Sequence, residues 1–457
     1  MRLTHQARSL LFLCIIAAGL LFRLYRADQY PFGFDQAQIL ANAFSISQGH
    51  LTLIGPRTGP AVMFTGPFIY YLTALFTPFG KNPYLVVMTS ITCAFVTGLA
   101  LIYLGRRYLL DDRKIALTLI FWAVSPFIVY LDRMPWNPNL SLLSASLVFY
   151  PLIGLTRRRA EFTDYFLVGI GSWLGYQAHF SGFLLPVLAG VICLIFYRRQ
   201  LTLFLASCLG LLISIIPTVL FDLRHSWLNL HGLMALANDS DTVSRFQFLI
   251  RLSHNVFILF ENQGKLLVNR QSAVLVVGVG FFIILIYLIW LMGSRVRKRQ
   301  AQLLIPLLWV SLVAFLYSYY RLPAPEYYYM IQFPAFLFIL TELSLQLYLL
   351  HKPIGFLLLA IFLVNGLRLA YQTPNQIGKL SLGDQYAVSR YLHLQVAAQP
   401  IQDIQYRMPH AANLGLVYLL EDIPKHTGGA SYTVIFPAQS YETYTRQFGL
   451  IGIRELR

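Results

Sequence analysis

The sequence has few charged residues. Asp, Glu, Lys and Arg make up 12% of its 457 positions, whereas soluble domains carry about 25%. Hydrophobic residues make up 57%, and the mean hydropathy is +0.60. This composition excludes a soluble enzyme, a disordered tail and a DNA-binding module. It predicts an α-helical polytopic membrane protein.

Cysteine is also scarce. The four cysteines all fall in apolar segments, at Cys14, Cys93, Cys193 and Cys208. None is placed for an exposed disulfide or a Cys-x-x-Cys metal site, so we interpret them as small packing residues. The sequence also lacks a P-loop, a Gly-x-Gly-x-x-Gly after a strand and a His-Glu-x-x-His motif. Energy for any reaction is therefore expected from an activated substrate or an ion gradient.

Eleven apolar segments are long enough, or nearly long enough, to cross a bilayer as helices. They are residues 9–25, 84–104, 115–131, 140–156, 164–180, 183–197, 201–221, 273–293, 303–320, 329–350 and 354–371. The first begins like a signal peptide, but its small residues lie inside the apolar run, so we interpret it as an uncleaved span.

The loops between these segments alternate in charge. One set, residues 1–8, 105–114, 157–163, 198–200, 294–302 and 351–353, holds 16 of the 35 Lys and Arg and only 3 of the 19 Asp and Glu. Short basic loops stay cytoplasmic. We therefore predict a multi-pass protein of the plasma (inner) membrane with a cytoplasmic N-terminus. The net charge of +16 is then mostly a topology signal, and no nucleic-acid partner is expected.

Three larger pieces, 26–83, 222–272 and 372–457, fall on the outer side. In the first, a helical pattern opens at Asp35 and stops near Gly49, and a second starts at Gly66-Pro67 and ends near Pro78. Both are predicted to lie along the interface. Residues 372–457 are predicted to form a small extracytoplasmic α/β domain behind a transmembrane domain of residues 1–371. Its helix is expected at 384–398 and its strands at 401–406 and 431–436.

Asp35 is the first candidate for chemistry. A carboxylate at the head of an interfacial helix can accept a proton from a hydroxyl group. The alternative is structural, because Asp35 and Gln38 match a capping box in which Asp35 caps the helix. The two roles are compatible, and spacing does not separate them.

Other ionisable residues gather on the same predicted side. Asp132, Arg133 and Asn137 lie in a short loop with two prolines, whose structural alternative is a tight turn. His179 ends a span and is either functional or a packing residue. Asp222, Glu326 and Tyr327 flank later spans. Four arginines are candidates to clamp an anionic ligand, with a rim salt bridge as the alternative for each: Arg57, Arg133, Arg224 and Arg321.

Several of these segments resemble the C-type membrane glycosyltransferases, and in particular the protein O-mannosyltransferases and aminoarabinose transferases of glycosyltransferase family 39. The most specific likeness is in the first outer loop, in Pro31-Phe32-Gly33-Phe34-Asp35-Gln36-Ala37 and Gly66-Pro67-Phe68-Ile69-Tyr70-Tyr71. Further landmarks follow in order over most of residues 1–370: Trp136-Asn137-Pro138, Gln177-Ala178-His179, Phe221-Asp222-Leu223-Arg224-His225 and Glu326-Tyr327-Tyr328.

The resemblance implies an inverting transfer of one sugar from a polyprenyl-phosphate donor to a hydroxyl of a lipid, glycan or protein acceptor on the outer face. Asp35 falls on the family's catalytic base. The sequence departs from the family at three positions. Gln36 replaces a second acid, which argues against a divalent metal; Gly66 replaces a basic residue; and Asn137 stands where relatives often have an acid.

Three other functions fit parts of the pattern. A lipid-linked saccharide transporter or flippase would show inverted repeats and polar groups at the midplane, whereas the polar groups here gather at one face. A surface-polysaccharide polymerase would join whole oligosaccharide units rather than move one sugar. A non-catalytic scaffold would be indifferent to loss of Asp35.

Overall fold

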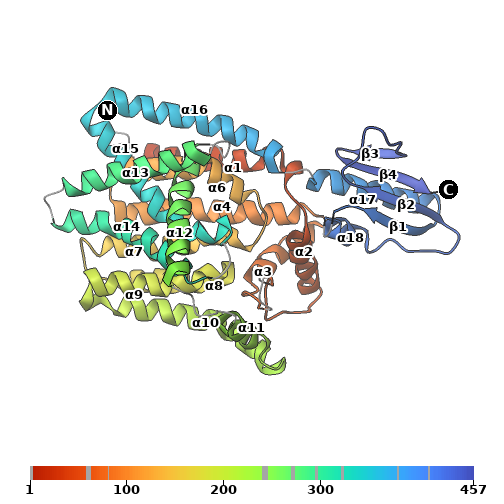
Figure 1. The fold of residues 1–457 in the computed structure, drawn as a ribbon, viewed down its shortest axis with the longest axis horizontal. Coiled ribbons are helices and arrows are strands. Elements are labelled where there is room, and N and C mark those ends of the chain that lie inside the picture. The colour runs from red at the N-terminus through yellow and green to blue at the C-terminus, as the bar shows by residue number, and fades with distance from the viewer. Residues whose placement is uncertain are drawn as a thin grey trace.

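The computed structural model describes residues 4–57, 63–80, 82–238, 245–268, 273–293, 297–320, 324–377, 380–409 and 412–456. Helices form a bundle, and a small sheet domain stands at one end of it (Figure 1). The helical membrane fold and the C-terminal sheet domain expected from the sequence are both confirmed.

Each of the eleven predicted spans coincides with a helix or a helix pair. The bundle contains α1 (His5–Leu24), α4 (Leu85–Leu104), α5 (Asp112–Val124) with α6 (Pro126–Asp132), α7 (Ser141–Gly154), α8 (Phe162–Ala178), α9 (Leu184–Phe196), α10 (Thr202–Arg224), α13 (Ala273–Met292), α14 (Arg297–Tyr317), α15 (Phe333–Leu350) and α16 (Lys352–Ile377). Within the described residues, seven helices are long and apolar enough to cross a membrane, or eight if α5 and α6 form one span bent by 59°. A count of eleven is therefore not confirmed.

The segment predicted as the second outer piece is also helical. It forms α11 (Leu228–Asn238) and α12 (Arg245–Lys265). Helix α12 packs against α13 and α14 and runs across the neighbouring bundle helices in Figure 1. Polar residues such as Asn255, Asn262 and Lys265 interrupt its apolar pattern, so hydropathy alone did not separate it from a loop.

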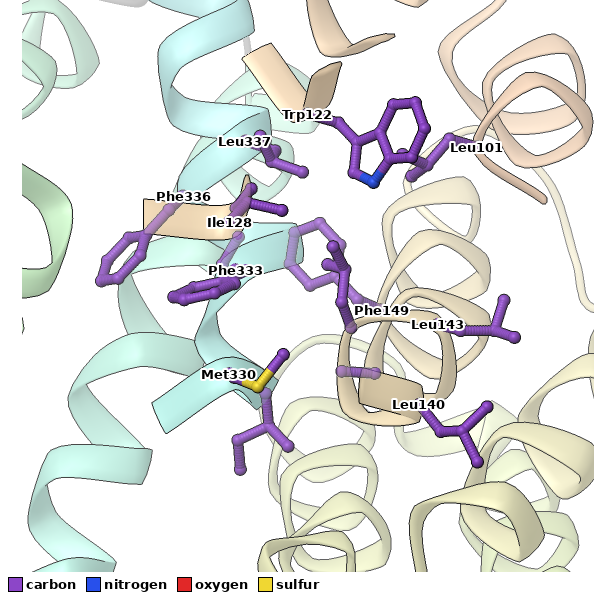
Figure 2. Close-up of a cluster of buried hydrophobic side chains, with 14 of the residues drawn as sticks. Leu101, Trp122, Ile128, Leu140, Leu143, Phe149, Met330, Phe333, Phe336 and Leu337 are labelled. Carbon is purple, nitrogen blue, oxygen red and sulfur yellow. The ribbon is translucent and has the colours of Figure 1, made fainter. Parts of the chain in front are cut away.

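Aromatic and aliphatic side chains fill the centre of the bundle. Trp122, Phe149, Phe333 and Leu337 are fully buried and converge from α5, α7 and α15 (Figure 2). In a bilayer, lipid tails are as apolar as these side chains, so close packing and interhelical hydrogen bonds carry the association.

Helices α8 and α10 show how such packing is built. A Cβ on Gly210 would lie 2.0 Å from the carbonyl oxygen of Gly169, so only glycine allows this approach. Polar side chains then pair across the contact: the hydroxyls of Ser172 and Ser207 share a hydrogen bond, and those of Tyr176 and Thr218 lie 2.8 Å apart. Small residues and hydroxyl pairs of this kind hold membrane helices together.

The first outer loop lies at one end of the bundle (Figure 1). It contains η1 (Ala27–Gln29), α2 (Phe34–Ser47), α3 (Phe68–Ala74) and η2 (Thr77–Phe79). Both predicted helices are present. Helix α2 ends before Gly49, whose φ of 91° favours glycine. Helix α3 starts at Phe68 with Pro67 as its N-cap, rather than with Pro67 as its first helical residue, and ends before Pro78.

The C-terminal domain contains α17 (Leu382–Ala398), β1 (Ile401–Arg407), α18 (Leu414–Leu420), β2 (Ala430–Ile435), β3 (Arg446–Phe448) and β4 (Ile451–Leu456). The sheet order is β1-β2-β4-β3, with β1 parallel to β2 and the other pairs antiparallel. The predicted helix and both predicted strands are present. Strands β3 and β4 were not predicted.

This domain docks on the first outer loop. The amide of Leu382 donates to the carbonyl of Tyr30 at 2.8 Å, and Nε2 of Gln385 donates to the carbonyl of Phe32 at 2.7 Å. The rings of Phe32 and Tyr418 lie 6.4 Å apart. The domain therefore stands beside the start of α2, at the end of the bundle where the first loop lies.

Candidate active site

Asp35 is the second residue of α2, and it does not cap the helix. The N-cap is Gly33, whose amide donates to Oε1 of Gln36 at 2.9 Å. Nε2 of Gln36 also donates to the carbonyl of Pro135 at 3.3 Å. The capping box of Asp35 with Gln38 predicted from spacing is therefore wrong. Gln36, at the third helical position, takes the reciprocal contact, which leaves the Asp35 carboxylate uncommitted.

The Asp35 carboxylate has no hydrogen-bond or ion-pair partner among the described residues. Its charge acts on Tyr70 of α3 and on Tyr327 of η7 (Glu326–Gln332), which places it between the two segments. Surrounding protein displaces part of its hydration and raises the pKa of Asp35 above the usual range, while the side chain keeps solvent-exposed surface. An unpaired, partly desolvated carboxylate that a substrate can reach is typical of a functional base.

Tyr327 joins three loops at this end of the bundle. Its ring centroid lies 4.5 Å from that of Trp136 and 5.4 Å from that of His179. Asn137, next to Trp136, donates from Nδ2 to the carbonyl of Ala178 and ties the Trp136 loop to the His179 loop. The structure thus brings Asp35, Asn137, His179 and Tyr327 to one region, as the sequence analysis expected.

His179 directly follows α8 and is buried beside Tyr327. Its Nδ1 accepts from the amide of Ser181 at 3.1 Å. A neutral imidazole that accepts at Nδ1 carries its proton on Nε2. His179 therefore presents Nε2–H as a hydrogen-bond donor rather than as a base.

Glu326 forms an ion pair that the sequence analysis did not find. Nζ of Lys265 lies 2.8 Å from Glu326 and 2.8 Å from Glu261 on its own helix. Lys265 is 4% exposed and lies over the ring of Phe127 at 5.4 Å. This lysine belongs to α12, which was not predicted, and it lies 61 residues from Glu326 in the sequence. No local signal could have identified the pair.

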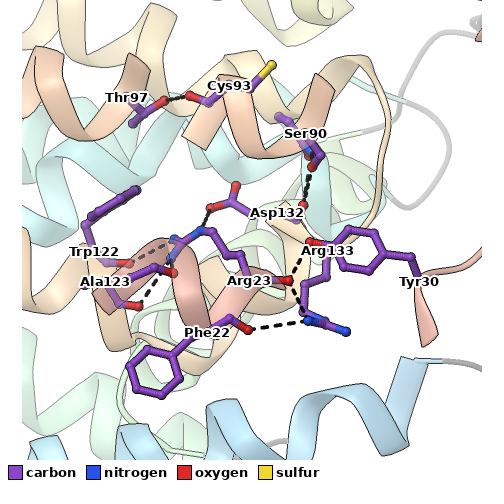
Figure 3. Close-up of polar contacts among 12 residues, drawn as sticks. Phe22, Arg23, Tyr30, Ser90, Cys93, Thr97, Trp122, Ala123, Asp132 and Arg133 are labelled. Atoms are coloured by element: carbon purple, nitrogen blue, oxygen red, sulfur yellow. Dashed lines mark hydrogen bonds and ion pairs between the residues drawn. The ribbon is translucent and has the colours of Figure 1, made fainter. Parts of the chain in front are cut away.

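Asp132 and Arg133 are committed to structural contacts (Figure 3). Asp132 pairs with Nε of the fully buried Arg23 at 2.7 Å. Arg133 donates to the carbonyls of Arg23 and Tyr25 at 2.7 Å and of Arg26 at 3.0 Å, which are orphan acceptors at the C-terminal end of α1. Both buried side chains therefore hold the end of α1, where the first outer loop begins.

Asp222 caps a helix that had not been predicted. Its Oδ1 accepts from the amide of Asn229 at 2.9 Å and from Nδ2 of Asn229 at 2.8 Å, and its Oδ2 accepts from the amide of Leu230 at 3.1 Å. Oδ1 of Asn229 in turn accepts from the amide of Phe64 at 2.7 Å. Asp222 therefore holds the first loop against the end of α10.

Two of the remaining candidate arginines are exposed. Arg57 forms a bridge with Phe64 in the first loop, and Arg224 ends α10. Neither guanidinium has a hydrogen-bond or ion-pair partner within the described part of the chain. Arg321 lies outside the described residues. No group of three or more His, Cys, Asp and Glu gathers anywhere in the described ranges.

No protein-family model matches the sequence, and no curated protein matches it either. Solved structures do match in fold. ArnT from Cupriavidus metallidurans bound to undecaprenyl phosphate aligns with a TM-score of 0.60 at 11% identity, over 99% of this chain and 98% of that chain. The apo state of the same protein gives 0.60 at 12% identity, over 98% and 97%. Oligosaccharyltransferase from Archaeoglobus fulgidus, in complex with zinc and sulfate, reaches only 0.47 at 14% identity, over 95% and 59%.

The likeness to ArnT extends over almost the whole of both chains, so it includes the bundle, the first outer loop and the C-terminal domain together. It confirms the fold that the resemblance in the sequence implied, which is the fold of ArnT. Identity of 11% is too low for the likeness to transfer a substrate or a residue role.

Proposed function

We propose that this protein is a membrane glycosyltransferase that moves a single sugar from a polyprenyl-phosphate donor to an acceptor hydroxyl on the extracytoplasmic face, with inversion. The observation that carries the proposal is the carboxylate of Asp35, which has no hydrogen-bond or ion-pair partner within the described ranges. It lies at the head of an interfacial helix whose N-cap is Gly33, with Gln36 as the reciprocal partner. The fold supports it, because ArnT, whose structure holds undecaprenyl phosphate, has the same architecture.

In the proposed reaction, Asp35 accepts the proton of the acceptor hydroxyl, and the oxygen attacks the anomeric carbon of the donor sugar. The bond between that carbon and the phosphate oxygen breaks, and polyprenyl phosphate leaves as the anion. The leaving group needs no proton from an acid, because phosphate is stable as an anion once cations neutralise it. The raised pKa of Asp35 makes it a stronger base than a fully solvated aspartate.

The exposed guanidiniums of Arg57 and Arg224 are the proposed cations for the donor phosphate, with Arg321 as a further candidate. Arg133 and Asp132 are left out of the proposed donor site because their hydrogen bonds are taken by the main chain and by Arg23. We propose that Tyr327, His179 and Asn137 shape the wall of the site around Asp35.

Replacement of Asp35 by Asn tests the proposal. The variant keeps the shape of the side chain but cannot accept the proton, so sugar transfer is expected to fall by at least about a hundredfold. Purified protein would be incubated with a panel of polyprenyl-phosphate sugars, and release of the bare lipid phosphate measured. Asp112→Asn is the control, since Asp112 pairs with Arg8 outside the proposed site. Full activity in the Asp35 variant would remove Asp35 from the mechanism.

A further inference from the structure

A cavity of about 360 Å³ opens on the C-terminal domain, between α17 and the end of α18. This volume lies within the range of about 300–1,000 Å³ typical of small-ligand sites. Its polar wall consists of Tyr386, Arg390, His393 and Asp422, with Leu394 and Leu419 as apolar neighbours. Ser389 also lines it, but its hydroxyl donates to the carbonyl of Leu419 at 3.0 Å and is committed to the fold.

Arg390, His393 and Asp422 keep solvent-exposed surface on this wall. The guanidinium of Arg390 is exposed and has no hydrogen-bond partner in the ranges the structure describes. Nε2 of His393 lies 3.1 Å from Oδ1 of Asp422, and these side chains keep 40% and 49% of their surface exposed. Hydrogen-bond donors and acceptors therefore lie next to one another on a solvent-exposed wall of the cavity.

This combination favours a sugar over a phosphate. A carboxylate in the wall repels a phosphate group, whereas a pyranose can donate its hydroxyls to Asp422 and accept from Arg390. The ring of Tyr386 supplies an apolar surface for the C–H face of a pyranose. A phosphate site would instead gather cations without a carboxylate among them.

The elements that line the cavity also border the first outer loop. Tyr386 packs edge-on against Tyr84 at 6.0 Å, at the start of α4, which places the cavity at the level of the first loop. On its other side, Leu419 follows Tyr418, whose ring contacts Phe32. Phe32 lies three residues before Asp35. A molecule held in the cavity thus stands beside the helix that carries the proposed base.

We propose that this cavity is an acceptor subsite that holds one saccharide unit of a glycan acceptor. The proposal rests on the proposed function and narrows its acceptor from a lipid, glycan or protein to a glycan. In it, Asp422 and Arg390 bind the sugar hydroxyls, Tyr386 stacks on the ring, and the next unit of the glycan extends toward Asp35.

Saturation-transfer NMR on the full chain tests the subsite. The protein would be kept in a polyoxyethylene detergent, because maltoside detergents carry sugars themselves. The probes are the α- and β-methyl glycosides of glucose, galactose, mannose and N-acetylglucosamine. At least one is expected to bind, and Arg390→Gln and Asp422→Asn are each expected to weaken its Kd about tenfold, the loss typical of one hydrogen bond to a charged group.

Matched controls come from the same domain. Arg446→Gln removes a guanidinium that lies over Phe448, and Asp403→Asn removes a carboxylate that pairs with Lys425, both outside the cavity. Neither should change binding. The proposal is overturned if no glycoside binds, if the two cavity variants bind as the wild type does, or if inorganic phosphate displaces the sugar at lower concentration than the sugar itself requires.

The Asp35→Asn variant separates this proposal from the proposed function. It should bind the glycoside with unchanged Kd, because Asp35 is not part of the cavity. If that variant also retains transfer, the proposed mechanism fails while the subsite stands. If it loses transfer but the cavity variants bind normally, the subsite fails while the mechanism stands.

Discussion

At the scale of single residues, Asp35 shows why a helix-terminal carboxylate cannot be assigned from spacing alone. The sequence allowed two roles for Asp35, a catalytic base and a cap paired with Gln38, and spacing did not separate them. The structure uses Gly33 as the N-cap and Gln36 as its reciprocal partner. The choice depends on Pro135, which is close only after folding and which accepts a hydrogen bond from Gln36.

The raised pKa of Asp35 predicts the pH dependence of transfer. In the proposed mechanism Asp35 must be ionised to accept the proton, so kcat is expected to fall as the pH drops through this pKa, at a pH higher than the value of about 3.9 for an ordinary aspartate. A pH–rate profile at saturating donor measures this limb. An acid limb at or below pH 3.9 would contradict the assignment.

The same shift has a defined sign for stability. The folded state holds the Asp35 proton more tightly than the unfolded state, so the contribution to stability is greatest below the unfolded pKa and is lost as the pH rises through the folded pKa. At neutral pH the ionised carboxylate thus opposes folding slightly. The Asp35→Asn variant should therefore have a Tm at pH 7 no lower than the wild type, whereas loss of a true capping residue would lower it.

The buried pair of Arg23 and Asp132 is expected to be the most sensitive charged contact in the bundle. Arg23→Gln leaves Asp132 as an unpaired charge in a dry site, which costs about 3–5 kcal/mol of unfolding free energy. Unfolding in detergent measures the loss. Glu161→Gln is the control, since Glu161 is exposed and its pair with Arg107 contributes about 1 kcal/mol or less. Equal effects in the two variants would contradict a special role for the buried pair.

At the scale of elements, apolar run length predicted the positions of the bundle helices well. Every predicted span coincides with a helix because hydrocarbon leaves the backbone few alternatives. Hydropathy did not predict α12, whose position depends on ion pairs as well as on apolar packing. Helix α12 carries a buried lysine that pairs with Glu261 on the same helix and with Glu326, which lies 61 residues away. A window average counts Lys265 and Glu261 as two separate charges and does not register that they are paired. The structural contacts of Asp132 and Arg133 were not predictable, because their arginine and carbonyl partners lie about 110 residues away in the sequence.

The cap of α11 links two elements that surround the proposed site. Asp222→Ala removes the acceptor for three N–H groups and releases Asn229 from Phe64. We expect faster hydrogen exchange at residues 63–67 and 228–238, equivalent to about 1–2 kcal/mol of local stability. Asp111→Ala is the control, because Asp111 caps α5 in one of the predicted cytoplasmic loops. Unchanged exchange at residues 63–67 would show that Asp222 does not hold the loop.

At the scale of the whole molecule, the main feature is the contact between the C-terminal domain and the first outer loop. Composition predicted that such a domain exists, and the positive-charge pattern predicted that it lies on the side of Asp35. The contact itself was not predictable, since its hydrogen bonds end on the main-chain carbonyls of Tyr30 and Phe32, which carry no sequence signature.

Gly415 is the position at which this contact can be broken. A Cβ there would lie 2.4 Å from the carbonyl oxygen of Phe32. Gly415→Val is therefore expected to displace α18 from the first loop and to lower transfer at least about tenfold, while the bundle stays folded. Gly278→Val, where a Cβ meets no atom within 4 Å, is the control. Transfer assays and limited proteolysis of the C-terminal domain measure the two effects.

The contact between the C-terminal domain and the first outer loop also has a consequence for synthesis of the protein. Phe32 and Asp35 leave the ribosome early, whereas Gln385 and Tyr418, which brace Phe32, are translated only after α16. A nascent chain whose first helices are already inserted therefore contains Asp35 but lacks the contacts that Gln385 and Tyr418 make with Phe32. Under the proposed mechanism, we therefore expect sugar transfer to begin only after the C-terminal domain has been translated and has docked on the first outer loop.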